Sequence, residues 1–338
     1  MVLRFVESDR GIGIHSPRPC RDLARHCGGH TKKTAVIVNP KSAGGKTAKQ
    51  WPAIGVSLAA KLGRCATRFT ESAGHATSIA RELLGEGYDL IIAAGGDGTV
   101  NEVANGFFDP LTGNPLRPGA ALGILPLGTG GDFRRSLGID LRNSIDVLAD
   151  GTARRIDAGI ARYKGYDGAM HSRYFINVVS FGMGGDVAAR SHNFLSPASG
   201  KAAFLFATFE TFLKYGGKRV RLTMDGNIGS HSFPVTNVAV GNGRYHGGGM
   251  HVCPKAKIDD GALDVTVIEY LRMHELVANL PTLYSDNLYR HRKTHHFRAR
   301  RVWAESDETV LIEIDGEPLG MLPLEITVLP GAIPVLYP

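Results

Sequence analysis

The sequence predicts an α/β protein of two domains, in which a parallel sheet covered by helices precedes a domain of antiparallel strands. The chain has 338 residues, of which 43% are hydrophobic, so it can bury a core in each of about two domains. From Thr34 to about residue 95, apolar β-branched runs alternate with helical patterns, as in βαβ units. After Arg155 the apolar runs are short and are separated by turns, which is typical of antiparallel β layers.

The first half repeats the order strand, loop, helix. The run TAVIVNP, which starts at Thr34, predicts a buried strand, and SAGGK predicts a loop. The segment TAKQWPAIGVSLAAKLG predicts a helix despite Pro52, and CATRFT, HATSIARELLGEG and YDLIIAAGG continue the alternation. Strands and helices at this spacing indicate a parallel sheet that is covered on both faces.

The second half is rich in β runs, with one helical stretch at KAAFLFATFETFLKY. The expected strands are YFINVVSFG, RVRLTMDG, FPVTNVAVGN, ALDVTVIEYL, HHFRARRVWAE and TVLIEIDG. We place the domain boundary near residue 158, so the domains span residues 32–158 and 159–318. Residues 1–31 contain Pro17 and Pro19 without clear periodicity, and we expect a loosely ordered extension there.

Composition narrows the class of protein. The net charge of +7 favours an acidic partner, which includes nucleotide phosphate, an anionic membrane surface and nucleic acid. The four cysteines lack CxxC spacing, so a disulfide framework and a zinc ribbon are both disfavoured and a reducing cytoplasm is expected. No apolar run reaches the roughly 18 residues of a membrane span, so any membrane contact should be peripheral.

A glycine-rich loop follows the strand YDLIIAA and precedes the helix that begins with VNEV. Its residues are Gly95, Gly96, Asp97, Gly98 and Thr99. Glycines let the backbone approach phosphates, and the amides at a helix start favour negative charge. An acid there repels phosphate directly, so Asp97 would act through Mg²⁺ or its water. The same pattern also fits a tight turn in which Asp97 only caps the helix.

A second glycine-rich loop follows the apolar run in ALGILPLGTGGDF. Two such loops from one parallel sheet would face the same carboxyl edge, where ligands of α/β proteins bind. Two standard nucleotide motifs are excluded by counting. A P-loop that ends at Thr47 would need glycine in place of Pro40, and a GxGxxG that starts at Gly182 would need glycine in place of Val187.

The chain resembles the diacylglycerol kinase catalytic-domain family, which includes bacterial lipid kinases and the sphingosine and ceramide kinases. The resemblance covers about residues 34–330 and lies in the order of the motifs VIVNPKSAGGK, GGDGTVNEV, LPLGTGGDFRRSLG, VGNGRYHGGGMHVCPKAKIDDGALDV and IEIDGE. It implies a phosphofructokinase-like α/β domain, a C-terminal β-sandwich that binds the lipid, and ATP in the cleft between them. It also implies that about residues 319–338 return to the first domain.

Matched motif by motif, the resemblance assigns site residues. The positions that would contact ATP are Asn39, Thr70, Gly95, Gly96, Asp97, Gly98, Thr99, Asn101, Glu102, Thr129 and Asp132. Asp97, Asp132 and Asp157 resemble an acidic network around a catalytic Mg²⁺. Lys257, Asp260 and Ala262 fall where relatives hold a structural Mg²⁺, although a plain DDG turn needs no metal.

The segment IEIDGE supplies the expected catalytic pair. Asp315 resembles the general base and Glu317 its supporting acid, with Asp97 as the second candidate for the base. Taken alone, DG after an alternating strand is also a good hairpin turn. One departure stands out, because Gly131 occupies a position where the family usually has Asn; we expect altered contacts there and an active site.

These motifs predict an ATP- and Mg²⁺-dependent lipid kinase that contacts an anionic membrane surface peripherally. The helical stretch at 202–215 would border an acyl-chain pocket or belong to ordinary core. The basic segment RHRKTHHFRARR would meet an anionic leaflet or form a solvated β face, and nucleic-acid binding ranks below both. The alternatives are a NAD kinase-like enzyme and a non-catalytic ATP- or lipid-binding regulator, and a homodimer stays open.

Overall fold

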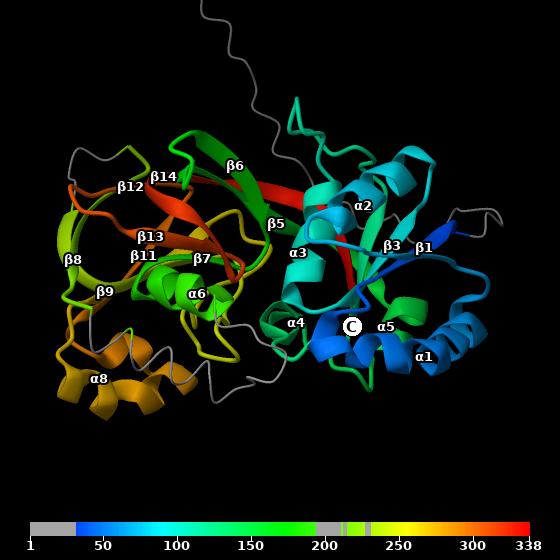
Figure 1. Ribbon diagram of the computed structural model, residues 1–338, viewed down its shortest axis with the longest axis horizontal. Coiled ribbons are helices and arrows are strands. Elements are labelled where there is room, and N and C mark those ends of the chain that lie inside the picture. The colour runs from blue at the N-terminus through cyan, green and yellow to red at the C-terminus, as the bar shows by residue number, and fades with distance from the viewer. Residues whose placement is uncertain (1–31, 194–210, 212–214, 227–230) are drawn as a thin grey trace, which may run out of the picture. The chain divides into compact units, whose positions relative to one another are not determined.

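The computed structural model describes residues 32–193, 211, 215–226 and 231–338 (Figure 1). The expected extension at 1–31 and nearly all of the expected helix at 202–215 lie outside these residues. Residues 33–338 form one compact unit. No helix in the described ranges is both long and apolar enough to cross a bilayer.

Four parallel strands form the N-terminal part of the sheet, in the order β4-β3-β1-β2. These strands are β1 (Thr34–Val38), β2 (Ala66–Phe69), β3 (Leu90–Gly95) and β4 (Ala121–Pro126). Every residue of β1 and β3 is buried, because strands in the middle of a parallel sheet are covered on both faces. The helical segments are η1 (Ser42–Gly45), α1 (Lys46–Leu62), α2 (His75–Gly85), α3 (Asp97–Gly106), α4 (Asp132–Ser136) and α5 (Ser144–Asp150).

The parallel register aligns the ends of β3 and β4. Gly95 at the end of β3 lies opposite Pro126 at the end of β4. The chain then passes from β3 into α3 and from β4 toward α4. Both glycine-rich loops therefore leave the same edge of the sheet.

The C-terminal half is an antiparallel β structure, as predicted. Its strands are β5 (Thr152–Gly165), β6 (Met170–Phe175), β7 (Val178–Gly182), β8 (Lys218–Met224), β9 (His231–Gly241), β10 (Leu263–Glu269), β11 (Thr294–Ala299), β12 (Arg301–Glu305), β13 (Leu311–Ile314) and β14 (Glu317–Tyr337). The run HHFRARRVWAE, expected as one strand, divides at Arg300, so that β11 pairs with β10 while β12 pairs with β8 and β14.

Helical segments lie between the strands of this half. They are α6 (Met183–Asn193), α8 (Met273–Asn279), η2 (Leu280–Tyr284) and η3 (Leu288–Arg290). A core of buried aliphatic and aromatic side chains fills the antiparallel part, separate from the core that surrounds the parallel strands.

The long strands β5 and β14 connect the two parts. They pair antiparallel from Thr152 to Gly165, and near its end β14 also pairs in parallel with β4, where Val335 lies opposite Leu122. All the strands consequently belong to one 14-stranded hydrogen-bonded sheet. The position near residue 158, chosen as the domain boundary, falls inside β5.

Candidate functional site

The two glycine-rich loops pack against each other through their backbones. A β-carbon added to Gly128 would lie 2.3 Å from the Cα of Gly96, and one added to Gly95 would lie 2.4 Å from Thr99 Oγ1. Real side chains do not tolerate such distances, so these positions require glycine. The composition of the loops thus follows from their close approach.

Asp97 joins the first loop to the second. Its carboxylate accepts hydrogen bonds from the backbone amides of Gly131 (2.6 Å), Asp132 (3.0 Å) and Phe133 (3.2 Å). These amides begin α4, and a carboxylate satisfies donors that a helix start leaves unpaired. Asp97 thus begins α3 and caps the neighbouring helix α4. Its expected contact with Mg²⁺ stays a prediction.

Several of the expected nucleotide-contacting residues gather at the start of α3. Asn39 Nδ2 donates to Thr99 Oγ1 at 3.1 Å, which connects the end of β1 to this helix. The Thr70 amide donates to the Val38 carbonyl at 2.9 Å, so the end of β2 lies beside them. Thr129 is exposed on the second loop. The polar groups that sequence reasoning grouped around ATP therefore share one sheet edge.

Glu102, which was expected to contact ATP, instead binds the start of α2. Its two carboxylate oxygens accept hydrogen bonds from the amides of Gly74 (2.8 Å) and Ala76 (3.1 Å) at the start of α2. The side chain caps that helix and holds α2 against α3. A direct contact with nucleotide would compete with this role.

Asp315 connects α3 with the antiparallel part. Its carboxylate accepts hydrogen bonds from Asn101 Nδ2 (2.7 Å) and from the amides of Ile176 (3.1 Å), Asn177 (3.1 Å) and Val178 (2.9 Å). Burial raises the pKa of Asp315 to about 6, although these hydrogen bonds act to lower it. Asn101, expected to contact ATP, is itself buried and engaged with Asp315.

The turn that carries Asp315 has the hairpin conformation that its sequence suggested. Asp315 has a φ of +47° and Gly316 a φ of +90°, both in the left-handed region. Glu317 follows, and its Oε1 would lie 3.3 Å from a β-carbon added to Gly98. The hairpin turn at Asp315 and Gly316 is therefore present, and it leaves the proposed catalytic role of Asp315 open.

Sequence reasoning missed a buried group beside Asp315. Glu313 is fully buried, and its carboxylate accepts from Ser180 Oγ (2.6 Å) and from the Gly316 amide (2.8 Å). His246 Nε2 forms an ion pair with the same carboxylate at 2.9 Å. The sequence analysis gave no role to Glu313 in the run LIEI. The available signal was that Glu313 is an acidic residue two positions before the expected base, Asp315.

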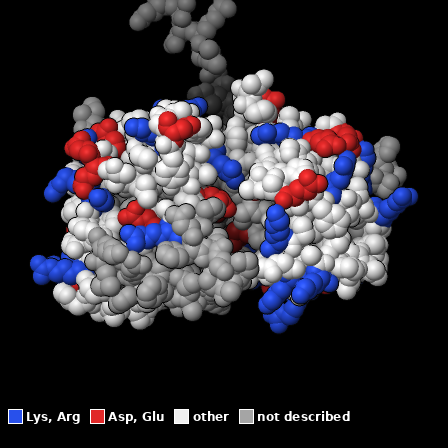
Figure 2. All heavy atoms as spheres, viewed as in Figure 1, with Lys and Arg blue, Asp and Glu red and all other residues white. Residues whose placement is uncertain are grey.

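Asp315, Glu313 and His246 line a cavity of about 440 Å³ together with apolar side chains. Its acidic lining residues are Asp97, Asp132, Glu313, Asp315 and Glu317. Its apolar lining comes mainly from α6, α8, η2 and nearby strands, and includes Met183, Val187, Met250, Val252, Ile268, Leu271, Leu276, Leu280, Leu283 and Leu288. Figure 2 shows acidic side chains in the hollow near the centre of the visible face.

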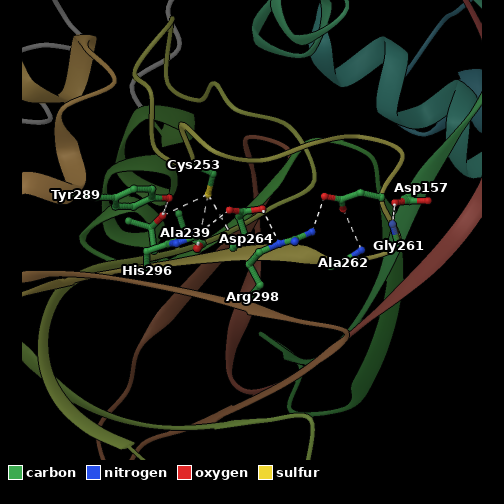
Figure 3. Close-up of polar contacts among 11 residues, drawn as sticks. Asp157, Ala239, Cys253, Gly261, Ala262, Asp264, Tyr289, His296 and Arg298 are labelled. Atoms are coloured by element: carbon green, nitrogen blue, oxygen red, sulfur yellow. Dashed lines mark hydrogen bonds and ion pairs between the residues drawn. The ribbon is translucent and has the colours of Figure 1, made fainter.

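Asp132 and Asp157 take part in separate contacts. Asp132 accepts from Arg135 Nη1 (2.5 Å) and from the Gly248 amide (2.8 Å), which ties α4 to the loop that carries His246. Asp157 instead accepts from the amides of Gly261 (2.6 Å) and Gly331 (2.7 Å), and burial raises its pKa. The structure thus places Asp157 at the 257–262 turn (Figure 3).

The same turn contains the residues expected to hold a structural Mg²⁺. Asp260 and the carbonyls of Lys257 and Ala262 would supply the hard oxygen donors that Mg²⁺ prefers. However, Arg298 Nη2 already donates to Asp260 Oδ2 at 2.5 Å, so a metal there would compete with a guanidinium. Among the residues that the structure describes, no three His, Cys, Asp or Glu side chains gather as a metal site.

Gly131, where the resemblance led us to expect Asn, has a physical explanation. Its φ is +70°, and an added β-carbon would lie 2.2 Å from Arg134 Nε. Arg134 is fixed by a hydrogen bond from Nη1 to the Ile139 carbonyl at 2.9 Å. The arginine occupies the space that a larger residue at position 131 would need.

We predict that Gly131→Ala lowers the free energy of unfolding by more than Gly138→Ala. Gly138 has nearly the same φ, +69°, but open space around it, so it reports the backbone cost of about 1 kcal/mol alone. The clash with Arg134 should add roughly another 1 kcal/mol. Urea unfolding measures the free energy of unfolding of both variants.

The Arg134→Ala background provides the control, because it removes the clashing side chain. There the two glycine substitutions should cost the same. An equal loss for both variants in the native background would show that Arg134 does not restrict position 131.

Comparisons with known proteins agree with this geometry. Residues 33–161 match the family described as Diacylglycerol kinase catalytic domain, and residues 177–337 match the YegS C-terminal NAD kinase beta sandwich-like domain. A Pseudomonas aeruginosa protein named "Probable lipid kinase YegS-like" is 33% identical over 315 residues, which cover 90% of this chain and 94% of that protein.

Two further relatives cover most of the chain. A protein of Staphylococcus saprophyticus named diacylglycerol kinase is 31% identical over 295 residues, which cover 86% of this chain and 91% of the relative. A crystal structure of a diacylglycerol kinase from Bacillus anthracis superposes with a TM-score of 0.65 at 25% identity, covering 91% of this chain and 97% of that one. The chain therefore belongs to the diacylglycerol kinase catalytic-domain family.

Proposed function

We propose that the protein is a lipid kinase that transfers the γ-phosphate of ATP to a hydroxyl of a lipid such as diacylglycerol. The observation that carries this proposal is a cavity lined by both acidic and apolar side chains, beside two glycine-rich loops. Relatives named lipid kinase and diacylglycerol kinase support the same reaction. A headgroup hydroxyl would meet the acids while acyl chains meet the apolar lining.

ATP would bind at the sheet edge formed by the two glycine loops. The amides and glycines there can approach phosphates, and Asn39, Thr99 and Thr129 offer polar groups nearby. Asp97 and Asp132 border the cavity with carboxylate oxygens, which suit Mg²⁺. Bound there, Mg²⁺ would neutralise charge on the phosphates; the chain's own residues align donor and acceptor.

Asp315 is the proposed proton acceptor for the lipid hydroxyl. It lines the cavity, and a pKa of about 6 leaves it ionised at neutral pH while keeping it basic enough to take a proton. Its four hydrogen bonds hold it in place, so the hydroxyl would replace one of them. The Glu317 carboxylate lines the same cavity and forms no hydrogen bond with the described residues, so it is available to support or replace Asp315.

The apolar lining indicates where acyl chains would lie. It comes largely from α6, α8 and η2, whereas the stretch at 202–215 that suggested a pocket from sequence falls almost entirely outside the described residues. Val277, Leu280 and Tyr284 follow one another at helical spacing and are 58%, 45% and 56% exposed. Because Leu280 and Tyr284 also line the cavity, we propose that this surface rests on the membrane.

The basic segment 290–301 contributes less free charge than its sequence suggested. Lys293 pairs with Glu275 at 2.7 Å, His296 with Asp264 at 2.5 Å, and His295 with Glu269. Arg298 pairs with Asp260. Apolar contact is therefore the main support for peripheral membrane binding, with anionic lipids as a secondary attraction.

The function is tested by labelled-ATP transfer with Mg²⁺ over a panel of diacylglycerol, sphingoid bases, phosphatidylglycerol and NAD⁺. We expect transfer to at least one lipid, and Asp315→Asn should lower kcat at least a hundredfold with nearly unchanged ATP binding. Transfer to NAD⁺ alone would contradict the proposal. Nucleotide binding without transfer to any acceptor would favour a regulator instead.

The pH profile and the Glu317→Gln variant show whether Asp315 or Glu317 accepts the proton. With Asp315 as base, kcat/KM should rise with pH through about 6 and level off above it, because the deprotonated form is active. Glu317→Gln should then retain this midpoint at a reduced rate. A larger loss in Glu317→Gln than in Asp315→Asn would assign the proton transfer to Glu317.

Vesicle sedimentation tests the membrane surface without relying on activity. Val277→Asp combined with Leu280→Asp should weaken binding to phosphatidylglycerol vesicles at least tenfold, because burial of each apolar side chain contributes roughly 1.5 kcal/mol. The matched control is Val56→Asp with Leu111→Asp, two exposed apolar residues outside the cavity lining. Equal weakening in both variants would exclude a specific surface.

A further inference from the structure

His246 is a partly buried histidine with one ring nitrogen left for a ligand. Its Nε2 lies 2.9 Å from Glu313 Oε1, and its side chain is 18% exposed. Ser180 Oγ and the Gly316 amide hold the Glu313 carboxylate in place. In the described part of the chain, no group forms a hydrogen bond with His246 Nδ1, and the residue lines the cavity.

The charges that line the cavity make a protonated imidazole at His246 useful for binding an anion. The lining contains five carboxylates and two histidines, His246 and His291, and among its described residues there is no lysine or arginine. Phosphoryl transfer brings an anionic donor into this acidic surrounding and develops more charge on its oxygens. A fixed cation in the lining would therefore be valuable to the reaction.

We propose that His246 is a phosphate-binding residue, whose Nδ1–H donates to an anionic phosphate oxygen that enters the cavity. The phosphate belongs either to ATP, as the group being transferred, or to the headgroup of the acceptor lipid. Glu313 and Ser180 are positioning residues that keep the imidazole oriented. This inference rests on the proposed kinase function and adds to it a recognition element that the glycine loops do not supply.

The electrostatic environment keeps His246 protonated. Burial by itself lowers the pKa of His246, but Glu313, and more weakly Asp132 and Asp315, raise it to about 9. Arg135 also lies in this region and pairs with Asp132 at 2.5 Å. At neutral pH both ring nitrogens then carry protons, one committed to Glu313 and the other available to a phosphate.

His246→Gln tests the proposal, with His251→Gln as the matched control. His251 lies in the same loop and also pairs with a carboxylate, Asp286, at 2.9 Å, but it does not line the cavity. We expect His246→Gln to lower kcat/KM at least tenfold, and His251→Gln to stay close to the native rate. If His246 binds the phosphate of ATP, kcat/KM should fall equally for diacylglycerol and for phosphatidylglycerol. If it binds the headgroup phosphate, kcat/KM should fall for phosphatidylglycerol alone.

Glu313→Gln provides a readout that a purely structural role would not move. The native kcat/KM should fall above about pH 9 as His246 loses its proton, and in Glu313→Gln this fall should move toward the ordinary histidine range near 6.5. In the native protein, addition of ATP or of phosphatidylglycerol should also shift the imidazole ¹⁵N signals of His246, which needs no variant.

The results distinguish this inference from the function on which it rests. A native protein that transfers phosphate, together with equal rates for His246→Gln and His251→Gln on both acceptors, would overturn the role of His246 alone. Unshifted ¹⁵N signals with both ligands would do the same. A native protein without any transfer would contradict the kinase function, while ligand-induced ¹⁵N shifts would still support phosphate binding at His246.

Discussion

The structure depends on how a buried carboxylate, that of Asp315, is accommodated. Removing a charge from water is costly unless hydrogen bonds compensate, and Asp315 collects four of them, from Asn101 and from three consecutive amides at residues 176–178. These donors come from α3 and from the start of β7. Satisfying one side chain therefore fixes the helix of the first glycine loop against the antiparallel part, and the cavity lies beside this junction.

Other aspartates use the same principle. The Asp97 carboxylate accepts hydrogen bonds from three backbone amides at the start of α4, and Asp132 accepts one from the loop that carries His246. Asp157 accepts hydrogen bonds from the amides of Gly261 and Gly331. Each carboxylate joins segments that are distant in sequence. Hydrogen bonds from backbone amides compensate the cost of burying these carboxylates. The structure thus gives each of these residues a structural role, and their chemical roles stay proposals.

Sequence reasoning anticipated the mixed α/β character, the antiparallel second half and the common location of the two glycine loops, because strand ends in a parallel sheet converge. It also singled out Asp315 and Asp97. It could not place Glu313 and His246, because they lie 67 positions apart in the printed chain and meet only through tertiary packing. Local patterns likewise could not show that Glu102 and Asn101 are engaged by other elements, or that Arg134 fills the space beside Gly131.

The contact between Asn101 and Asp315 joins the glycine-loop part to the antiparallel part, and we expect it to couple their stability. A double-mutant cycle of Asn101→Ala and Asp315→Ala, measured by urea unfolding, tests it most directly. We expect an interaction free energy of at least about 1 kcal/mol, because each single substitution leaves the partner of a buried hydrogen bond unpaired. Effects that add to within about 0.3 kcal/mol would contradict it.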